Sequence, residues 1–264
     1  MNGGSALARV RRRLDRLRWE LAAALAPRRR VRTRGLTFTL PCDNRITHYR
    51  WSSYGSKEPE TLDWLDRWIR EDDVLFDVGA NIGVYSLYAA LRHPKVRVVA
   101  FEPEYANLHL LRDNIVLNGL ADRIETYSIA LGDRSGLSRL HVQDLTPGAA
   151  LHTEACDALA VTEAGQRVVW SEGVWVMTLD DFSESRRRWP NAVKIDVDGG
   201  EARVLAGARR ALASPALRTV LVEADAGGPA VAGCASLLGA AGLRRLDAAP
   251  AGSANQIWVR EGHA

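Results

Sequence analysis

Short apolar runs alternate with amphipathic segments along most of the chain, and this alternation restricts the fold more than any other feature. Runs typical of buried strands cover residues 74–78, 96–101, 124–129, 192–197, 219–224, 243–247 and 256–260. Segments with helical spacing follow most of these runs, whereas residues 137–190 are less regular. The alternation predicts an α/β fold, with a mostly parallel sheet and helices on both faces. Ligands bind such sheets beyond the carboxyl ends of the strands, where the strand order reverses.

The N-terminal segment differs from the rest of the chain in charge. Residues 1–35 hold eleven arginines against two acidic residues, although the whole chain has a formal net charge of only +3. One apolar stripe at helical spacing runs along this segment, made by Leu14, Leu17, Leu21 and Leu25. We therefore expect a basic helical arm over residues 1–34 and a single domain over residues 35–264.

The arm has three interpretations. Clustered arginines beside an apolar stripe suit an anionic membrane surface. The same stripe equally suits docking on the rest of the protein, and a solvated helical extension is the plainest alternative. Nucleic acid is the least favoured of the anionic partners.

The start of the domain is expected to be a short β hairpin followed by a helix. Short strands are expected within residues 31–40 and 45–51, turning at Gly35 and near Asp43, and a helix is expected from Pro59. Two tryptophans in that helix have the spacing of core residues, and two earlier aromatic residues can form a platform for a sugar ring. The core pair is Trp64 and Trp68, and the platform pair is Trp51 and Tyr54.

Composition argues against a membrane-spanning or secreted protein. No run approaches the ~18 apolar residues that a transmembrane helix needs. The early run at residues 21–26 is too short for the apolar core of a secretory signal. The three cysteines, Cys42, Cys156 and Cys234, are too scattered to indicate a disulfide framework or a zinc site. We expect a cytoplasmic protein whose arm allows contact with the inner face of the membrane.

The most informative motif is D-V-G-A-N-I-G at residues 77–83, which closes an apolar strand and opens a helix. Its glycines, Gly79 and Gly83, allow a tight turn and close approach of the backbone to a ligand. A dinucleotide fingerprint starting at Gly79 would also need glycines where this chain has Asn81 and Val84. An NAD-dependent oxidoreductase is therefore the weaker alternative.

Two acidic residues stand at strand ends on the expected ligand edge. Asp77 would repel a phosphate but suits a cationic ligand, such as the sulfonium of S-adenosyl-L-methionine. Glu102 follows the next strand nineteen residues after Gly83, the spacing at which an acidic residue binds ribose hydroxyls, and Pro103 fixes the turn. The alternative is that Asp77 and Glu102 cap the helices that follow them.

The segment K-I-D-V-D at residues 194–198 is predicted to be a buried strand with Lys194, Asp196 and Asp198 on one face. Asp196 is the preferred candidate for the base, or for the group that orients an acceptor hydroxyl. Lys194 serves equally well as a structural ion-pair partner, and Asp198 alternatively caps the next helix. Two acids at this spacing without a histidine indicate a metal only weakly, and no metal is predicted.

The sequence gives fewer indications of the residues that would bind the acceptor. His152 follows P-G-A-A-L at residues 147–151, in the irregular region before the fourth strand. It is the candidate for a second base, carried on a substrate loop. Neither the acceptor nor the oligomeric state follows from the sequence.

Several of these segments resemble those of the FkbM-type methyltransferases, which use S-adenosyl-L-methionine on a seven-stranded Rossmann-like sheet. Within residues 55–225 the resemblance is carried by E-P-E (58–60), F-D-V-G-A-N-I-G (76–83), A-F-E-P (100–103), A-L-G-D (130–133), T-L-D-D (178–181), K-I-D-V-D-G-G-E (194–201) and V-E-A (222–224). Three asparagines in one helix add to it: Asn107, Asn114 and Asn118. The family usually has E-G-A-E where this chain has D-G-G-E, so the contact of that glutamate is not carried over to the shorter Asp198.

The resemblance implies O-methylation of a sugar hydroxyl in a glycan or glycolipid, or of a hydroxyl in a secondary metabolite, with S-adenosyl-L-methionine as cofactor. A non-catalytic module that keeps the cofactor-binding fold is a further alternative. Glu58 is expected near the methionine end and Ala130 and Leu131 at the adenine edge. The complete set expected around the cofactor is Glu58, Asp77, Gly79, Ala80, Asn81, Gly83, Glu102, Pro103, Asn107, Ala130, Leu131 and Asp196.

Overall fold

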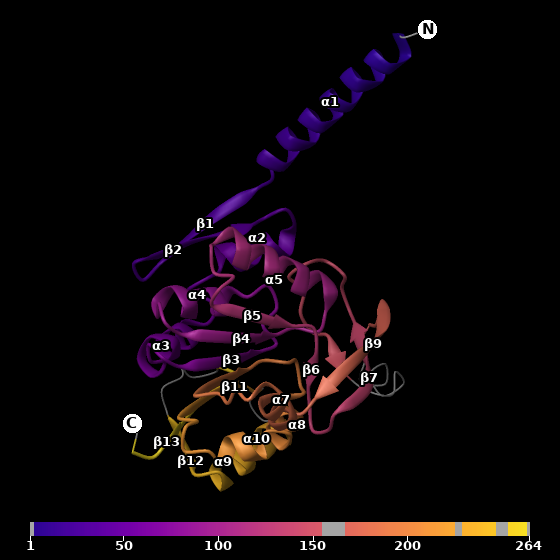
Figure 1. Ribbon diagram of the computed structural model, residues 1–264. Coiled ribbons are helices and arrows are strands. Elements are labelled where there is room, and N and C mark those ends of the chain that lie inside the picture. Colours follow the sequence, from indigo (N-terminus) through magenta and orange to yellow (C-terminus); the bar gives the residue numbers. More distant parts are fainter. Residues whose placement is uncertain (1–2, 155–166, 225–228, 247–252, 263–264) are drawn as a thin grey trace.

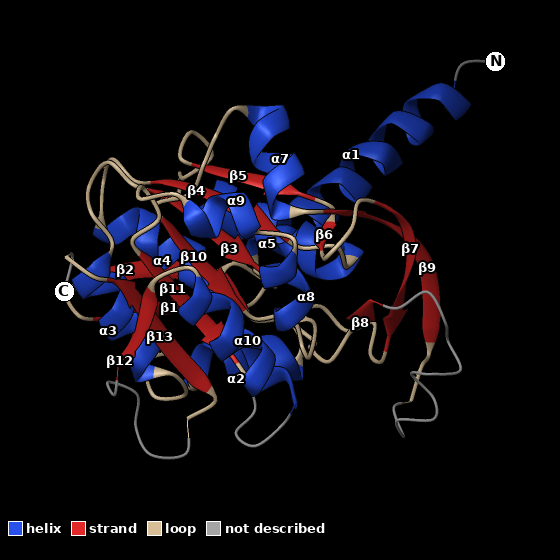
Figure 2. Cartoon of the chain, turned by 90° about the horizontal axis from the view of Figure 1, so that it is seen from below, coloured by secondary structure: helices blue, strands red, loops and turns tan. Residues whose placement is uncertain are grey.

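The computed structural model describes residues 3–154, 167–224, 229–246 and 253–262, and its centre is a seven-stranded sheet (Figures 1 and 2). The strand order is β12-β13-β11-β10-β3-β4-β5. The strands are β3 (Val74–Val78), β4 (Arg97–Phe101), β5 (Ile124–Tyr127), β10 (Ala192–Ile195), β11 (Thr219–Glu223), β12 (Leu243–Leu246) and β13 (Asn255–Arg260). Only the two pairings of β13 are antiparallel. The predicted α/β class with a mostly parallel sheet of seven strands is confirmed.

Helices cover both faces of this sheet (Figure 1). One layer holds α3 (Pro59–Trp68), α4 (Val84–Arg92) and α5 (Tyr105–Leu117), and the other holds α7 (Leu179–Arg186), α8 (Glu201–Ala206), α9 (Arg209–Ala213) and α10 (Pro229–Ala240). Successive side chains of a strand point to opposite faces, so Leu75 packs with the first layer and Phe76 with the second. The strands are therefore apolar on both sides, as expected for a sheet buried between two helical layers.

A second sheet lies beside the carboxyl edge of the first, with strand order β6-β9-β7-β8. Its strands are β6 (Ala130–Leu131), β7 (Gly136–Val142), β8 (Thr153–Glu154) and β9 (Trp170–Met177). The sequence pattern marks residues 137–190 only as less regular, so this small sheet was not predicted. Exposed apolar side chains on these strands, such as Leu137 and Trp175, blur the alternation by which a half-buried strand is recognised.

The N-terminal region consists of α1 (Gly3–Ala24), the hairpin β1 (Arg28–Thr33) and β2 (Leu36–Pro41), and α2 (Arg45–Ser52). Arg34 and Gly35 at the hairpin turn both have positive φ, the backbone of a tight two-residue turn. The strand expected at residues 45–51 is instead α2. Asn44 accepts hydrogen bonds from the first turn of α2 and Thr47 bonds back to Asn44, and this capping box overrides the strand-like spacing.

Helix α1 projects away from the rest of the protein and does not dock on it (Figure 1). The leucines of its stripe are each more than half exposed: Leu14, Leu17, Leu21 and, just beyond α1, Leu25. Among the described helices, none combines the length and the apolar character needed to cross a membrane.

Candidate functional site

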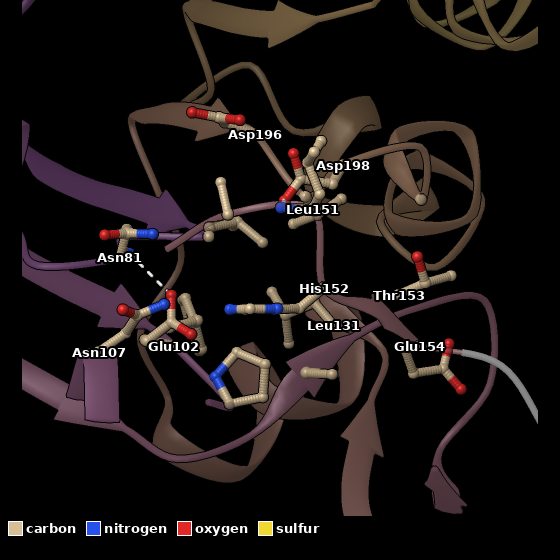
Figure 3. Close-up of a pocket in the computed structure, with 18 of the residues that line it drawn as sticks. Asn81, Glu102, Asn107, Leu131, Leu151, His152, Thr153, Glu154, Asp196 and Asp198 are labelled. Atoms are coloured by element: carbon tan, nitrogen blue, oxygen red, sulfur yellow. Dashed lines mark hydrogen bonds between the residues drawn. The ribbon is translucent and has the colours of Figure 1, made fainter. Parts of the chain in front are cut away.

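A cavity of about 610 Å³ opens at the carboxyl edge of the large sheet (Figure 3). The strand order reverses there, because β4 and β5 extend the sheet on one side of β3 while β10 and β11 extend it on the other. Strand ends form much of the wall, through Gly79 after β3, Glu102 after β4, Asp196 after β10 and Glu223 at the end of β11. Open α/β sheets bind their ligands at this position.

Most residues predicted to contact a cofactor or acceptor are brought together here. The cavity is lined by Gly79, Asn81, Glu102, Pro103, Asn107, Ala130, Leu131, His152 and Asp196. Four other predicted residues do not contribute to its wall: Glu58, Asp77, Ala80 and Gly83. All four are buried, so any influence they have on a ligand passes through their neighbours.

The loop after β3 requires glycine for two physical reasons. Gly79 has a φ of 77°, and a Cβ atom there would lie 1.7 Å from the carbonyl oxygen of Asp196. Gly83 has a φ of 79°, and its Cβ atom would lie 2.1 Å from Cδ1 of Leu111. Asn81 also has a positive φ, which asparagine tolerates better than most residues. The loop is thus compressed between β10 and α5, with its backbone at the cavity wall.

Glu102 holds this loop in place. Its Oε2 accepts a hydrogen bond from the backbone N–H of Asn81 at 2.8 Å, and its Oε1 accepts one from Glu104 at 2.9 Å. Burial raises the pKa of Glu102 to about 7, although the two backbone N–H groups oppose that rise. The helix cap predicted as the alternative for Glu102 is provided instead by Glu104, whose carboxylate accepts bonds from the first turn of α5.

Residues 147–152, which we call the strap, cross the cavity and are bonded to both of its sides. Asn107 accepts a bond from the N–H of Gly148 at 2.7 Å, and the amides of Asn81 and Asn107 both donate to the carbonyl of Ala149. On the far side, Asp198 accepts a bond from the N–H of Leu151 at 2.6 Å. The strap thereby joins the loops after β3 and β10.

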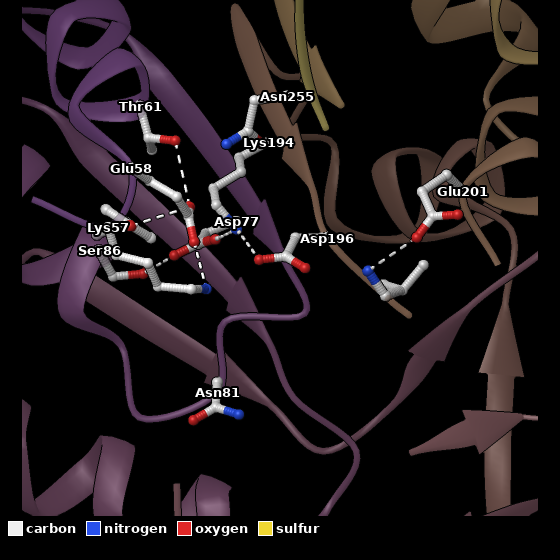
Figure 4. A network of polar contacts seen from close by, with 12 residues as sticks. Lys57, Glu58, Thr61, Asp77, Asn81, Ser86, Lys194, Asp196, Glu201 and Asn255 are labelled. Carbon is white, nitrogen blue, oxygen red and sulfur yellow. Dashed lines mark hydrogen bonds and ion pairs between the residues drawn. The ribbon is translucent and has the colours of Figure 1, made fainter. Parts of the chain in front are cut away.

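A charged cluster lies beneath the loop (Figure 4). Lys194 bonds Asp196 at 2.9 Å and lies 3.9 Å from Asp77, whose other oxygen accepts a bond from Ser86 at 2.5 Å. Burial would lower the pKa of Lys194, but Asp196 and Asp77 raise it above its ordinary value. Asp77 therefore neither caps α4, whose N-cap is Gly83, nor faces the cavity. It anchors the lysine that holds Asp196.

Glu223, at the end of the neighbouring strand β11, lines the same cavity as Asp196. The nearby Asp196 and burial together raise the pKa of Glu223 to about 9. Burial opposes ionisation of Asp196, yet Lys194 and Glu223 hold its pKa below its usual range.

Glu58 reaches the same cluster from the N-terminus of α3. Its carboxylate bonds Lys57 at 2.5 Å and accepts a hydrogen bond from the hydroxyl of Tyr85 at 2.9 Å. Burial opposes ionisation of this carboxylate, but Lys194 and Lys57 lower the pKa of Glu58. Glu58 thus fixes Lys57, which does line the cavity.

Two expectations for the end of β10 were wrong. The strand ends at Ile195, and Asp198 has a φ of 54°, so Asp198 does not continue a strand face with Asp196. Helix α8 begins after Gly200 without a side-chain cap, so Asp198 does not cap it. Instead, Glu201 accepts bonds from the N–H groups of Gly199 and Val197. The two consecutive glycines let the chain turn too sharply for a strand to persist.

His152 lies inside the cavity (Figure 3). Its Nδ1 accepts a hydrogen bond from the N–H of Gln143 at 3.4 Å, and its buried Nε2 has no hydrogen-bond partner in the described ranges. With Nδ1 as acceptor, the proton sits on Nε2, so the ring presents a donor to a ligand. Burial lowers the pKa of His152, which keeps the ring neutral near pH 7.

The predicted aromatic platform does not contribute to the cavity wall. The indole N–H of Trp51 donates to the carbonyl of Arg30 at 3.0 Å, and Tyr54 packs edge-on against Phe38. Both rings therefore fasten the hairpin to the domain. Trp64 is fully buried, and Trp68 packs against the same core, as predicted.

The sequence analysis missed several residues that line the cavity. Glu223 stands at a strand end as Glu102 does, so the same argument could have found it. Arg50, Lys57 and Arg203 come from helices or loops distant in sequence, and no motif marks them. Within the described ranges, no group of three or more His, Cys, Asp or Glu side chains is arranged to hold a metal ion.

Comparison with known proteins agrees with this geometry. The chain is 34% identical over 179 residues to the 31-O-demethyl-FK506 methyltransferase FkbM of Streptomyces tacrolimicus, covering 59% of this chain and 66% of the relative. It is 34% identical over 161 residues to the hexuronic acid methyltransferase AglP of Haloferax volcanii, covering 60% and 58%. The chain thus spans less than two thirds of the length of either relative.

Solved structures give more distant matches. Aeropyrum pernix fibrillarin, in complex with S-adenosyl-L-methionine, is 13% identical, with 87% of this chain and 80% of that chain covered and a TM-score of 0.47. A SAM-dependent methyltransferase from Agrobacterium tumefaciens is 14% identical, with coverage of 90% and 71% and the same TM-score of 0.47.

The sequence profile of one family, described as Methyltransferase FkbM domain, matches residues 77–236. These residues include β3, β4, β10 and β11, whose ends form the cavity wall. The matched region is more than half of the chain, and the resemblance noted in the motifs is confirmed. The chain belongs to the FkbM family of methyltransferases.

Proposed function

We propose that this protein transfers a methyl group from S-adenosyl-L-methionine to a hydroxyl group of an acceptor. The observation that carries the proposal is the set of carboxyl groups at three strand ends of one cavity, Glu102, Asp196 and Glu223. The negative charge of Asp196 at the cavity wall suits a cationic adenosyl donor better than a diphosphate. Family membership supports the same reaction.

The residues fit an adenosyl ligand. Each oxygen of Glu102 already accepts one backbone N–H and retains a second lone pair, which can accept a ribose hydroxyl. Ala130 and Leu131 supply an apolar wall suited to an adenine ring. We assign Glu102 to the ribose, and the cluster of Lys194 and Asp196 to the methionine end, where the reaction takes place.

The bound cofactor supplies a methyl group on a positively charged sulfur, from which the acceptor oxygen displaces it in line. Asp196 holds the acceptor hydroxyl and takes its proton. Because Lys194 and Glu223 hold the pKa of Asp196 low, it is a weak base toward a neutral alcohol. The hydroxyl becomes acidic as its oxygen bonds to carbon, so Asp196 accepts the proton late in the transfer. The strap excludes water above the reacting atoms.

The acceptor class is drawn from chemistry shared by the relatives. One relative's name specifies a hexuronic acid, and the other's specifies 31-O-demethyl-FK506. We propose an alcohol of a sugar or of a hydroxylated metabolite as the acceptor. The cavity of about 610 Å³ is large enough for an adenosyl donor and part of such an acceptor.

Calorimetric titration with S-adenosylhomocysteine tests the cofactor. We expect binding by the unmodified chain, weakening by about 1 to 3 kcal/mol in Glu102→Ala, and no change in Glu125→Gln. Glu125 is a matched control because it lies on the neighbouring strand β5 and does not line the cavity. Absence of heat at millimolar ligand, or binding of NAD in its place, would contradict the proposal.

A second measurement tests the reaction. Incubation with radiolabelled methyl donor and separated glycan, lipid and small-molecule fractions of cells should label one fraction, and Asp196→Ala should abolish the labelling. Retained S-adenosylhomocysteine binding with no labelled fraction would favour a non-catalytic module instead.

A further inference from the structure

Arg50, on α2, is a cation at the cavity without a carboxylate partner. Among the described residues, three lysine or arginine side chains line the cavity. Lys57 is paired with Glu58 at 2.5 Å, and Arg203 is paired with Glu154 at 2.6 Å and with Asp133. No carboxylate of the described residues lies within 4.0 Å of the guanidinium of Arg50. Within the described part of the chain, its one hydrogen bond runs from Nε to the carbonyl of Gly148 at 2.6 Å.

The geometry of that bond leaves the binding end of the side chain open. Gly148 belongs to the strap, so Nε is fixed against the strap backbone, while the two terminal nitrogens find no partner among the residues that the structure describes. A planar guanidinium fork of this kind matches the two oxygens of a carboxylate. Burial lowers the pKa of Arg50, although the charges of Asp196 and Glu58 partly offset this effect. A partly buried cation without a partner is costly, and a ligand anion would relieve that cost.

The surroundings of Arg50 are also asymmetric in charge. A second cavity, of about 490 Å³, adjoins the first along the strap and shares Arg50 and Lys57 with it. Arg167 is a third cation on its wall, and Asp144 is its single carboxylate among the described lining residues. Acidic residues outnumber basic residues on the wall of the first cavity, whereas basic residues outnumber the acidic one among the described lining residues of the second. Arg50 stands at the boundary between them.

We propose that Arg50 binds a ligand carboxylate at this boundary. The inference rests on the proposed function, because it concerns the ligands of the same site. Two ligands can bring the carboxylate: the methionine part of the cofactor, or an acceptor that carries an acidic group and extends into the second cavity. The shared chemistry is an anion held by two parallel N–H···O bonds from Arg50.

The test compares Arg50→Gln with Arg45→Gln in the full chain. Arg45 is a matched control because it lies on the same helix but is exposed and does not line either cavity. Calorimetry measures the binding of S-adenosylhomocysteine and of its decarboxylated analogue to each variant. If the carboxylate belongs to the cofactor, Arg50→Gln weakens the binding of S-adenosylhomocysteine at least tenfold and leaves the binding of the analogue unchanged. Arg50→Lys then restores part of the lost affinity.

A second arm addresses the acceptor. With S-adenosylhomocysteine bound, titration with methyl glucuronide and methyl glucoside compares a charged with a neutral sugar. If the acceptor brings the carboxylate, the unmodified chain prefers the glucuronide, and Arg50→Gln removes that preference while S-adenosylhomocysteine binds as before. Thermal unfolding of each variant confirms that it is folded.

The outcomes separate this inference from the proposed function. If the unmodified chain binds S-adenosylhomocysteine but Arg50→Gln matches Arg45→Gln in both arms, the role of Arg50 is overturned and the proposed function stands. If the unmodified chain does not bind S-adenosylhomocysteine, the proposed function fails and the assignment of Arg50 fails with it.

A second observation, independent of the cavity, concerns α1. At 100° per residue, Val10, Leu14, Leu17 and Leu21 fall within about 60° of one another, and each is more than half exposed. Arginines flank this stripe on both sides, with Arg11 and Arg18 on one flank and Arg9 and Arg13 on the other. Long arginine side chains beside an apolar stripe can reach outward while the stripe enters an apolar phase.

We infer that α1 lies on an anionic lipid surface, with this stripe in the headgroup and acyl boundary. Charge complementarity favours this occupant, and four further arginines on β1 continue the basic surface: Arg28, Arg29, Arg30 and Arg32. A second copy of α1 packed on the same stripe would bring the flanking arginines against one another. An apolar stripe between cationic flanks therefore fits lipid better than itself.

Flotation of the full chain with phosphatidylcholine vesicles, with and without 30% phosphatidylglycerol, tests this inference. We expect binding only to the anionic vesicles, loss of binding in high salt, and about tenfold weaker binding for Leu17→Gln. Trp19→Gln is the control, because Trp19 is also a large, exposed hydrophobic residue of α1 but lies about 180° from the stripe. Equal binding of both variants, no binding of the unmodified chain, or a dimer that Leu17→Gln dissociates would overturn the inference.

Discussion

The two rims of the cavity differ in how fully their polar groups are bonded. On the rim formed by the loops after β3 and β4, Glu102 bonds two backbone N–H groups and Asn81 bonds the strap. On the rim formed by α2 and the strap, Arg50 uses only one donor and Nε2 of His152 has no partner. The first rim is complete without a ligand, whereas the second has donors to spare. The rim formed by the loops after β3 and β4 is therefore preorganised, and the rim formed by α2 and the strap keeps donors available for a ligand.

The largest expected effect concerns the preorganised rim. Gly79→Ala places a Cβ atom 1.7 Å from the carbonyl of Asp196, at a φ of 77°. Because neither backbone can yield without moving a strand, we expect a loss of ~3 kcal/mol or more in the free energy of unfolding. Denaturant unfolding measures this loss. Gly173→Ala is the control, since no atom lies within 4 Å of its Cβ position, and it should change stability by ~0.5 kcal/mol or less. Equal stability of the two variants would mean that the loop is not compressed.

The second prediction sharpens the contrast through pH. The pKa of Glu102 is raised to about 7 in the folded chain, and bonds from ribose hydroxyls favour its ionised form. S-adenosylhomocysteine should therefore bind about tenfold more tightly at pH 8 than at pH 6. Glu102→Gln should flatten this dependence. A profile that is identical in the variant would assign the titrating group elsewhere.

The same carboxyl group affects stability in the opposite direction. Because its folded pKa lies above its unfolded value, Glu102 contributes stability at pH 4 that is lost as the pH rises through 7. The difference in unfolding free energy between the unmodified chain and Glu102→Gln should therefore fall by about 3 kcal/mol between pH 4 and pH 8. A difference that stays constant with pH would contradict the raised pKa.

The third prediction concerns the hydrogen bonds that join the two rims through the strap. Asn107→Ala removes its two hydrogen bonds to Gly148 and Ala149 of the strap, at an expected cost of about 1 to 2 kcal/mol. Hydrogen exchange at the strap amides should accelerate. Asn118→Ala is a close control, because Asn118 makes two similar bonds to Thr39 in the hairpin. Faster strap exchange in both variants would mean that Asn107 does not fasten the strap specifically.

The smallest expected effect lies on the open rim. Burial lowers the pKa of His152, so the unfolded chain binds more protons there, and stability falls as the pH drops below the ordinary histidine value of ~6.5. His152→Gln should be slightly less sensitive to acid between pH 7 and pH 5 in thermal unfolding. His109→Gln, at an exposed position on α5, should follow the unmodified chain. Greater acid sensitivity in His152→Gln would contradict the direction of the shift.

The preorganised rim could be predicted from the sequence because its parts are close together along the chain. The loop glycines and Glu102 follow successive strands, and their spacing is set by one strand-loop-helix unit. The resemblance to a family added the expectation that the cofactor is S-adenosyl-L-methionine. Asp77 was misplaced because its position at a strand tip does not reveal that Lys194, from β10, covers it.

The open rim could not be predicted, because it is assembled from parts that only tertiary packing brings together. Arg50 and the strap are about a hundred residues apart, and their contact runs through a backbone carbonyl, which leaves no signal in either side chain. The strap itself lies between strands whose exposed apolar residues hid the small sheet. Local propensity for residues 45–51 was likewise overridden by a capping box at Asn44.

At Gly148 and Ala149 the strap is held by its peptide groups: the carbonyl of Ala149 accepts two asparagine amides, and the carbonyl of Gly148 accepts Nε of Arg50. The side chains of Ala150 and Leu151 line both cavities and make none of these bonds. Exchanging either residue would therefore change the shape of both cavity walls without removing a hydrogen bond that fastens the strap.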